Sequence, residues 1–172
     1  LAAITEPKRV GELMRAIDAY GGSPIVKAAL QLSALTFVRP GELRQAEWSE
    51  FDLGAGKWVI PAKRMKMKAE HLVPLSTQAV AILKDLEQFA GRSNYVFPGA
   101  RSNNRPLSDN GPRTALRAMG YSNNEMTPHG FRAMASTLLN EQGWRPDVIE
   151  RQLAHAEQNQ IRAAYHRSTY LE

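Results

Sequence analysis

A mostly apolar segment over residues 25–37 constrains the fold of this chain more than any other feature. Few polar side chains interrupt it, which predicts a helix that is buried on nearly all sides. Ser23-Pro24 precedes the segment as a start signal, and Pro40 follows it and can open a short helix through Ala46. Arg39 stands directly before that proline, so we expect it at a helix–helix junction with an extended backbone.

Helical periodicity and turn signals predict the remaining elements. Residues 8–20 are predicted to form a helix, and residues 57–60 and 71–75 two strands joined by a basic hairpin loop over 61–70. Two further helices are expected with a serine as N-cap, from Ser76 to about Phe89 and from Ser108 to about Met119, with a loop over 91–106 between them. Another is expected from Thr127-Pro128 to about Asn140, followed by two short helices over 146–153 and 157–166. The predicted fold is therefore a single α+β domain, mainly α-helical, with a small antiparallel β-sheet.

Composition excludes several classes of protein. The 172 residues include no cysteine, which removes disulfide scaffolds, zinc fingers, thiol nucleophiles and iron–sulfur sites. The 43% of hydrophobic and 23% of charged residues are typical of a globular protein. No apolar run reaches the length of a membrane span, so we expect a cytoplasmic protein without a membrane partner. The chain begins with Leu1 rather than Met, and we expect it to be a fragment of a longer protein.

The positive charge is unevenly distributed. The net charge is +5, and residues 1–50 carry six basic and six acidic side chains, so the excess lies in residues 51–172, with sixteen against eleven. Such a surplus suggests an anionic partner, with nucleic acid as the leading candidate. A basic surface that serves solubility is an equally good explanation of the charge alone.

Two arginine motifs could bind a phosphate. In Thr127-Pro128-His129-Gly130-Phe131-Arg132, Thr127 is a good N-cap, and His129 and Arg132 share one side of the helix beside its anion-attracting N-terminus. The second arginine, Arg39, is followed three residues later by Glu42, which could orient it. Taken alone, each motif is better explained as a solvated face or a structural ion pair.

Three further features are ambiguous in the same way. The hairpin loop carries basic side chains that could reach a phosphate, but that could also be ordinary surface charge: Lys63, Arg64, Lys66 and Lys68. His155 ends a short predicted helix, and Tyr165 follows it ten residues later. A tyrosine becomes a nucleophile only where nearby cations stabilise its phenolate, and otherwise it packs its ring. Together these groups suit phosphoryl transfer by protein cations, because the sequence shows no carboxylate cluster for a metal.

The motifs in combination resemble the catalytic domain of tyrosine recombinases, most closely the prophage and genomic-island integrases. The resemblance covers almost the whole chain. In chain order its motifs are Thr-Phe-Val-Arg39-Pro-Gly-Glu-Leu, Lys66 upstream of His-Leu-Val-Pro-Leu-Ser76, Thr-Pro-His129-Gly-Phe-Arg132, Ile149-Glu-Arg-Gln-Leu-Ala-His155 and Ala-Ala-Tyr165.

The resemblance implies a reaction on double-stranded DNA without cofactor, metal or small-molecule substrate. Tyr165 would attack the scissile phosphate and form a 3′-phosphotyrosyl link. Arg39, Arg132 and His155 would hold the phosphate oxygens, and Glu42 would orient Arg39. Lys66 would protonate the leaving 5′ oxygen, and His129 would assist proton transfer at the tyrosine. Lys63, Arg64 and Lys68 would contact the DNA backbone.

The same resemblance implies that residues 1–172 are a C-terminal catalytic domain that lacks the arm-binding and core-binding domains and the last helix. The full protein would form a tetramer on attachment sites and integrate or excise a prophage or genomic island. His155 and Tyr165 are one residue further apart than in many members, which leaves Tyr170 as the reserve nucleophile. Three alternatives stay open: a type IB topoisomerase, a catalytically silent DNA-binding module and, least favoured, a metal-dependent nuclease.

Overall fold

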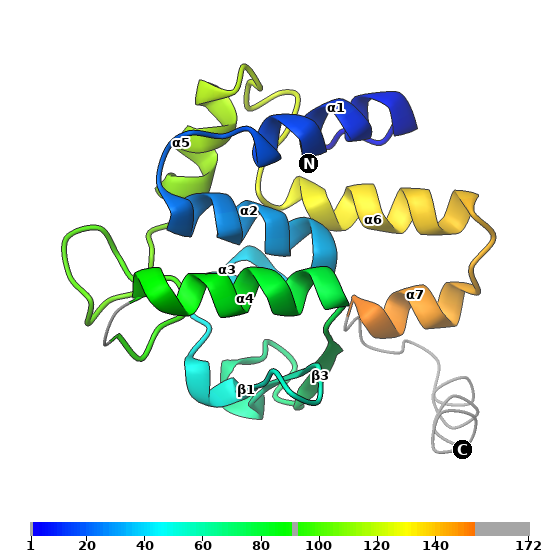
Figure 1. Cartoon of the computed structure of the whole chain (residues 1–172). Coiled ribbons are helices and arrows are strands. Elements are labelled where there is room, and N and C mark those ends of the chain that lie inside the picture. The colour runs from blue at the N-terminus through cyan, green and yellow to red at the C-terminus, as the bar shows by residue number, and fades with distance from the viewer. Residues whose placement is uncertain (1, 91–92, 154–172) are drawn as a thin grey trace.

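The computed structural model describes residues 2–90 and 93–153, which form a helical body with a small sheet at one edge (Figure 1). The principal elements run α1 (Pro7–Asp18), α2 (Pro24–Thr36), α3 (Pro40–Arg44), β1 (Phe51–Asp52), β2 (Lys57–Ile60), β3 (His71–Pro74), α4 (Thr77–Ala90), α5 (Asn110–Ala118), α6 (Gly130–Glu141) and α7 (Pro146–Gln152). Two short 3-10 helices, Trp48–Glu50 and Ala62–Arg64, flank the first two strands. This order confirms the predicted mainly helical α+β domain.

Helix α2 is the centre of the core. It contacts α1, α3, α4, α5 and α6, and seven of its thirteen residues are buried. Ser23 caps it by accepting a hydrogen bond from the Val26 backbone N–H, and Pro24 occupies its first turn. The helix ends at Phe37, which adopts the left-handed conformation at φ 60°. This ending redirects the chain into Arg39 and α3, as the Arg39-Pro40 junction predicted.

The sheet is a three-stranded antiparallel meander in the order β1-β2-β3. Trp58 pairs with Val73 and Ile60 with His71, so alternate residues of β2 and β3 face the core. The stacked rings of Phe51 and Trp58, with centroids 5.0 Å apart, attach β1 to β2. The hairpin of β2 and β3 was predicted, whereas β1 was not, because two residues are too few to show an alternating pattern.

Two helices begin later than predicted. Ser108 does not cap α5; its carbonyl accepts the Gly111 N–H, and Asp109 occupies the N-cap position. Thr127 likewise does not cap α6: its hydroxyl donates to the Ala2 carbonyl at 3.5 Å, and a turn closed by the Gly130 N–H on the Thr127 carbonyl precedes the helix. In both cases the start signal is satisfied by a turn or a tertiary contact instead of the helix. The predicted helix over 157–166 lies outside the described residues.

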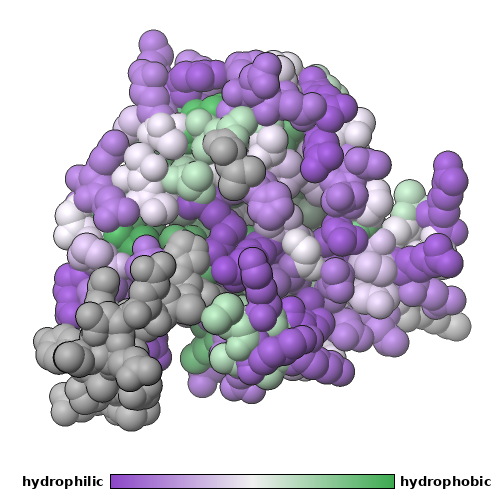
Figure 2. Space-filling model, turned by 180° about the vertical axis from the view of Figure 1, so that it is seen from behind, coloured by the Kyte–Doolittle hydropathy of each residue, from purple (hydrophilic) through white to green (hydrophobic). Residues whose placement is uncertain are grey.

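Figure 2 shows the back of the molecule, where hydrophilic side chains dominate and hydrophobic ones are visible only in small patches. Among the described residues, no helix is long and apolar enough to cross a membrane. The surface seen in this view therefore offers mostly polar contacts to a partner.

Candidate active site around two arginines

Arg39 is positioned by the short helix that follows it. Its backbone N–H donates to Oε1 of Glu42 at 3.2 Å, and its Nη1 lies 3.5 Å from Oε2 of the same carboxylate. Glu42 is buried, whereas the Arg39 side chain keeps a quarter of its surface exposed. The carboxylate thus holds the buried Nη1 of the arginine, while a quarter of the side chain stays exposed to an incoming anion.

Arg132, in the first turn of α6, is anchored by two backbone carbonyls. Its Nη1 donates to the Phe37 carbonyl and its Nη2 to the Leu153 carbonyl, each at 2.6 Å. These bonds join the ends of α2 and α7 to the start of α6. Burial and the nearby charge of Arg39 lower the pKa of Arg132 to about 10, with Glu42 and Glu150 acting in the opposite direction.

The two guanidinium groups therefore share one half-buried location. The charge of each arginine is partly desolvated, and Arg39 acts directly on the pKa of Arg132. Two like charges repel each other, and the Glu42 carboxylate offsets that repulsion only in part, because Arg39 still lowers the pKa of Arg132. Such a pair favours a doubly coordinated phosphate, because guanidinium donors match its oxygens.

Sequence reasoning missed His71, the first residue of β3. It is 9% exposed, and its charge environment consists of Glu42, Arg132 and Arg39. Burial lowers its pKa below the usual value of 6.5; Glu42 raises it, and the two arginines lower it again. The signal was present as alternation along β3, in which His71 and Val73 take the inward positions.

Three buried polar atoms in this cluster have no hydrogen-bond partner: Arg39 Nη1, Glu42 Oε2 and His71 Nδ1. Buried polar groups are nearly always satisfied, so a concentration of unsatisfied atoms marks a place that is built for a function or a ligand. Within the described ranges, no group of three histidine, aspartate or glutamate side chains could hold a metal ion. The groups of the cluster that can bind an anion are the two arginines.

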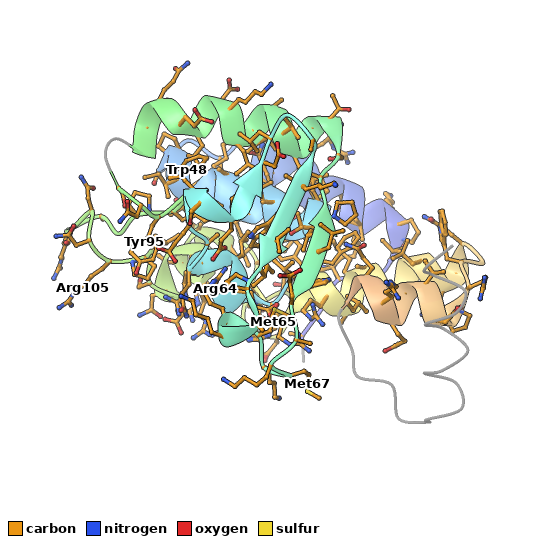
Figure 3. All side chains as sticks on the ribbon, turned by 90° about the horizontal axis from the view of Figure 1, so that it is seen from below. Trp48, Arg64, Met65, Met67, Tyr95 and Arg105 are labelled. Atoms are coloured by element: carbon orange, nitrogen blue, oxygen red, sulfur yellow. The ribbon has the colours of Figure 1, made fainter. Side chains whose placement is uncertain are left out.

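The hairpin loop between β2 and β3 projects from the body, and Met67 lies at its outer tip (Figure 3). Lys63, Lys66 and Lys68 are all exposed, and Lys68 adopts a positive φ of 55°. No hydrogen bond or ion pair connects Lys66 to another described residue. The loop therefore presents its lysines to solvent, a few residues upstream of His71.

Arg64 differs from the predicted DNA-backbone contact. Its Nε and Nη2 donate to the two carboxylate oxygens of Glu50 at 2.7 and 2.6 Å, and its Nη1 donates to the Glu42 carbonyl at 3.2 Å. The side chain is 12% exposed and points into the body (Figure 3). Three of its N–H groups are therefore engaged inside the protein, where they link Glu50 to α3, and this favours a structural role over the predicted contact with DNA.

His129 occupies the N-cap position of α6 and is exposed. It borders a pocket of about 230 Å³ that reaches Pro40 and Gly41 of α3 and the start of α5. It therefore lies near the Arg39 junction, and its carbonyl accepts a hydrogen bond from the Arg132 backbone N–H at 3.2 Å. The remaining predicted site residues, His155, Tyr165 and the reserve Tyr170, lie outside the described residues.

Comparison with known proteins shows the family to which the chain belongs. Residues 4–172 match the family model described as the phage integrase family. The chain is 44% identical to the protein IntB of Escherichia coli K12 over 97% of its own length, and 46% identical to the integrase of Enterobacteria phage P4 over 95%. It covers 46% and 41% of these relatives, so it spans less than half of their length. The chain belongs to the phage integrase family.

Solved structures show the same fold. The XerH site-specific recombinase, bound to its difH substrate, superposes with a TM-score of 0.74 at 18% identity, covering 94% of this chain and 49% of that one. The XerA recombinase gives a TM-score of 0.72 at 21% identity, covering 91% and 57%. The architecture described above is therefore that of the tyrosine recombinases.

Proposed function

We propose that this chain is the catalytic part of a site-specific DNA recombinase that cuts and rejoins DNA strands without a metal. The observation that carries the proposal is the partly desolvated pair of Arg39 and Arg132, which suits a phosphate with developing negative charge. Family membership and the integrases among the relatives support the same reaction class.

In this reaction the Tyr165 hydroxyl attacks the scissile phosphorus, a phosphotyrosyl bond forms, and the bond to the 5′ oxygen breaks. Arg39, Arg132 and His155 stabilise the negative charge on the non-bridging oxygens. Lys66 gives its proton to the leaving 5′ oxygen, and His129 assists removal of the tyrosine proton. Because one phosphoester replaces another, a 5′-hydroxyl from a partner strand can reverse the step without an energy source.

The remaining assignments follow from the family. The chain serves as the C-terminal catalytic domain behind arm-binding and core-binding domains, and four copies assemble on a pair of attachment sites. Lys63 and Lys68 contact the DNA backbone from the hairpin loop. The reaction takes place where the chromosome lies, in the bacterial cytoplasm, and moves a prophage or genomic island. A related lambda integrase, solved as a tetramer on a Holliday junction, supports this assembly.

Covalent trapping tests the proposal. Full-length protein is incubated with a nicked substrate of its own attachment sequence, in chelator, and resolved on a denaturing gel. Wild type is expected to give a covalent band, which Tyr165→Phe loses and Tyr170→Phe keeps. Loss only in Tyr170→Phe would move the nucleophile and keep the reaction. Absence of any band on a bound, verified site would point to a silent DNA-binding module.

Two further readouts distinguish a recombinase from a nuclease and from a topoisomerase. A metal-dependent nuclease would lose cleavage in the chelator and leave no covalent protein. A type IB topoisomerase would relax a supercoiled plasmid that lacks the attachment site, whereas a recombinase is expected to join two attachment sites and leave that plasmid supercoiled.

A further inference from the structure

We infer that His71 is a positioning residue of the proposed reaction, whose neutral imidazole keeps Arg39 and Glu42 in their working arrangement. The inference rests on the proposed function, because it concerns the arginine that binds the scissile phosphate. His71 itself is not assigned a contact with DNA. It acts through the charged groups beside it.

The backbone holds His71 firmly in place. It is the first residue of β3 and pairs with Ile60 across the hairpin, and its side chain is nine-tenths buried. Its neighbour Leu72 points to the opposite face and is 53% exposed. A polar ring at a buried strand position costs stability unless its nitrogens find partners, so a role beyond packing is expected.

The unpartnered atoms around His71 are complementary. Arg39 Nη1 is a donor and Glu42 Oε2 is an acceptor. They lie 3.5 Å apart as an ion pair, but neither atom makes a hydrogen bond. His71 Nδ1 is the third unpartnered atom, and it accepts a hydrogen bond when the ring is neutral with its proton on Nε2. Two buried acceptors, Glu42 Oε2 and His71 Nδ1, thus remain unpaired in the cluster that holds the arginines, and Nδ1 is an acceptor only while His71 is neutral.

Protonation removes this arrangement. An imidazolium has no acceptor and would place a third positive charge beside Arg39 and Arg132. Glu42 on α3, Arg39 at the N-cap of α3 and Arg132 on α6 are the charged groups that act on the ring from the packed elements. Glu42 would then pair with the imidazolium and release Arg39. The lowered pKa of His71, caused first by burial, keeps the ring neutral near pH 7.

The test measures the rate of covalent-complex formation by the full-length protein between pH 5 and pH 8. In wild type the rate is expected to fall as His71 becomes protonated below pH 6.5. His71→Asn keeps an acceptor near the Nδ1 position but cannot titrate, so it should retain activity and shift the acid limb to lower pH. His71→Leu should lose about tenfold or more at every pH, and the matched control Leu72→Asn should follow wild type.

The outcomes separate this inference from the proposed function. No covalent complex from wild type at any pH contradicts the proposed function. A wild-type complex whose pH profile is unchanged in His71→Asn, or whose rate is unchanged in His71→Leu, overturns the role of His71 alone. Thermal unfolding checks that each variant is folded. If neither His71 variant is folded, an NMR titration measures the pKa of the His71 imidazole in the wild-type protein. A pKa of 6.5 or above overturns the inference.

Discussion

The guanidinium of Arg132 donates a 2.6 Å hydrogen bond to the carbonyl of Phe37, the residue that ends α2 in the left-handed conformation. A second bond to the Leu153 carbonyl extends the link to the end of α7. Helix α2, from the first part of the chain, and the consecutive helices α6 and α7 thus meet at one side chain. The same side chain is proposed to bind the scissile phosphate, so its position depends on the whole helical body.

Replacing Arg132 by lysine should reduce cleavage strongly while preserving the charge. Lysine cannot bond both carbonyls and a phosphate in the fixed geometry of a guanidinium, so we expect a loss of about 10²–10³-fold in the rate of covalent-complex formation. Gel quantification on the nicked substrate measures the rate. Arg117→Lys is the control, because Arg117 is exposed and bonds Asn123. Near-wild-type cleavage by Arg132→Lys would contradict its proposed role.

Replacing Arg64 by methionine should lower stability without changing the salt dependence of DNA binding. The variant leaves Glu50 buried without its ion-pair partner, at a cost of about 3 kcal/mol in the free energy of unfolding. Chemical denaturation measures that energy. Lys63→Met is the matched control: it should leave stability nearly unchanged and reduce the salt slope of DNA binding by about one unit. Unchanged stability together with a reduced salt slope of DNA binding in Arg64→Met would instead show that Arg64 contacts a phosphate.

Replacing Lys66 by methionine should slow cleavage because the leaving 5′ oxygen loses its proton donor. General-acid catalysis typically contributes about 10²–10⁴-fold. A substrate with sulfur in place of that oxygen should restore most of the rate, because a thiolate leaves without protonation. Rates on the two substrates are compared for wild type, Lys66→Met and Lys68→Met, and the last variant should show no such rescue. Equal defects on both substrates would assign Lys66 to DNA binding instead.

Replacing Gly130 by alanine should displace the N-terminal segment. The new Cβ would lie 2.5 Å from the Ala2 carbonyl and 2.9 Å from the Met126 sulfur, too close for either. We expect a loss of about 1–3 kcal/mol in the free energy of unfolding, together with faster amide exchange at residues 2–5. Gly21→Ala is the control, since a Cβ there meets no atom within 4 Å. Unchanged exchange in Gly130→Ala would contradict this contact.

Local sequence patterns were sufficient to predict the helical body and the hairpin. The apolar run of α2, the Arg39-Pro40 junction and the alternation of β2 and β3 are local patterns, and local patterns are what periodicity detects. They also identified Arg39, Arg132, Glu42 and the lysines as candidate site residues, because those side chains stand in motifs that can be read along the chain.

The contacts that these side chains make became known only from the packed structure. It gave Thr127 and Ser108 turn or tertiary contacts in place of caps, and it turned Arg64 inward to a buried carboxylate. It also brought His71 to the two arginines. These outcomes depend on partners far away in the sequence, and no local pattern records whether a charged side chain ends in solvent or against Glu50. Burial and partner choice are properties of the packed chain, which explains why they appear only there.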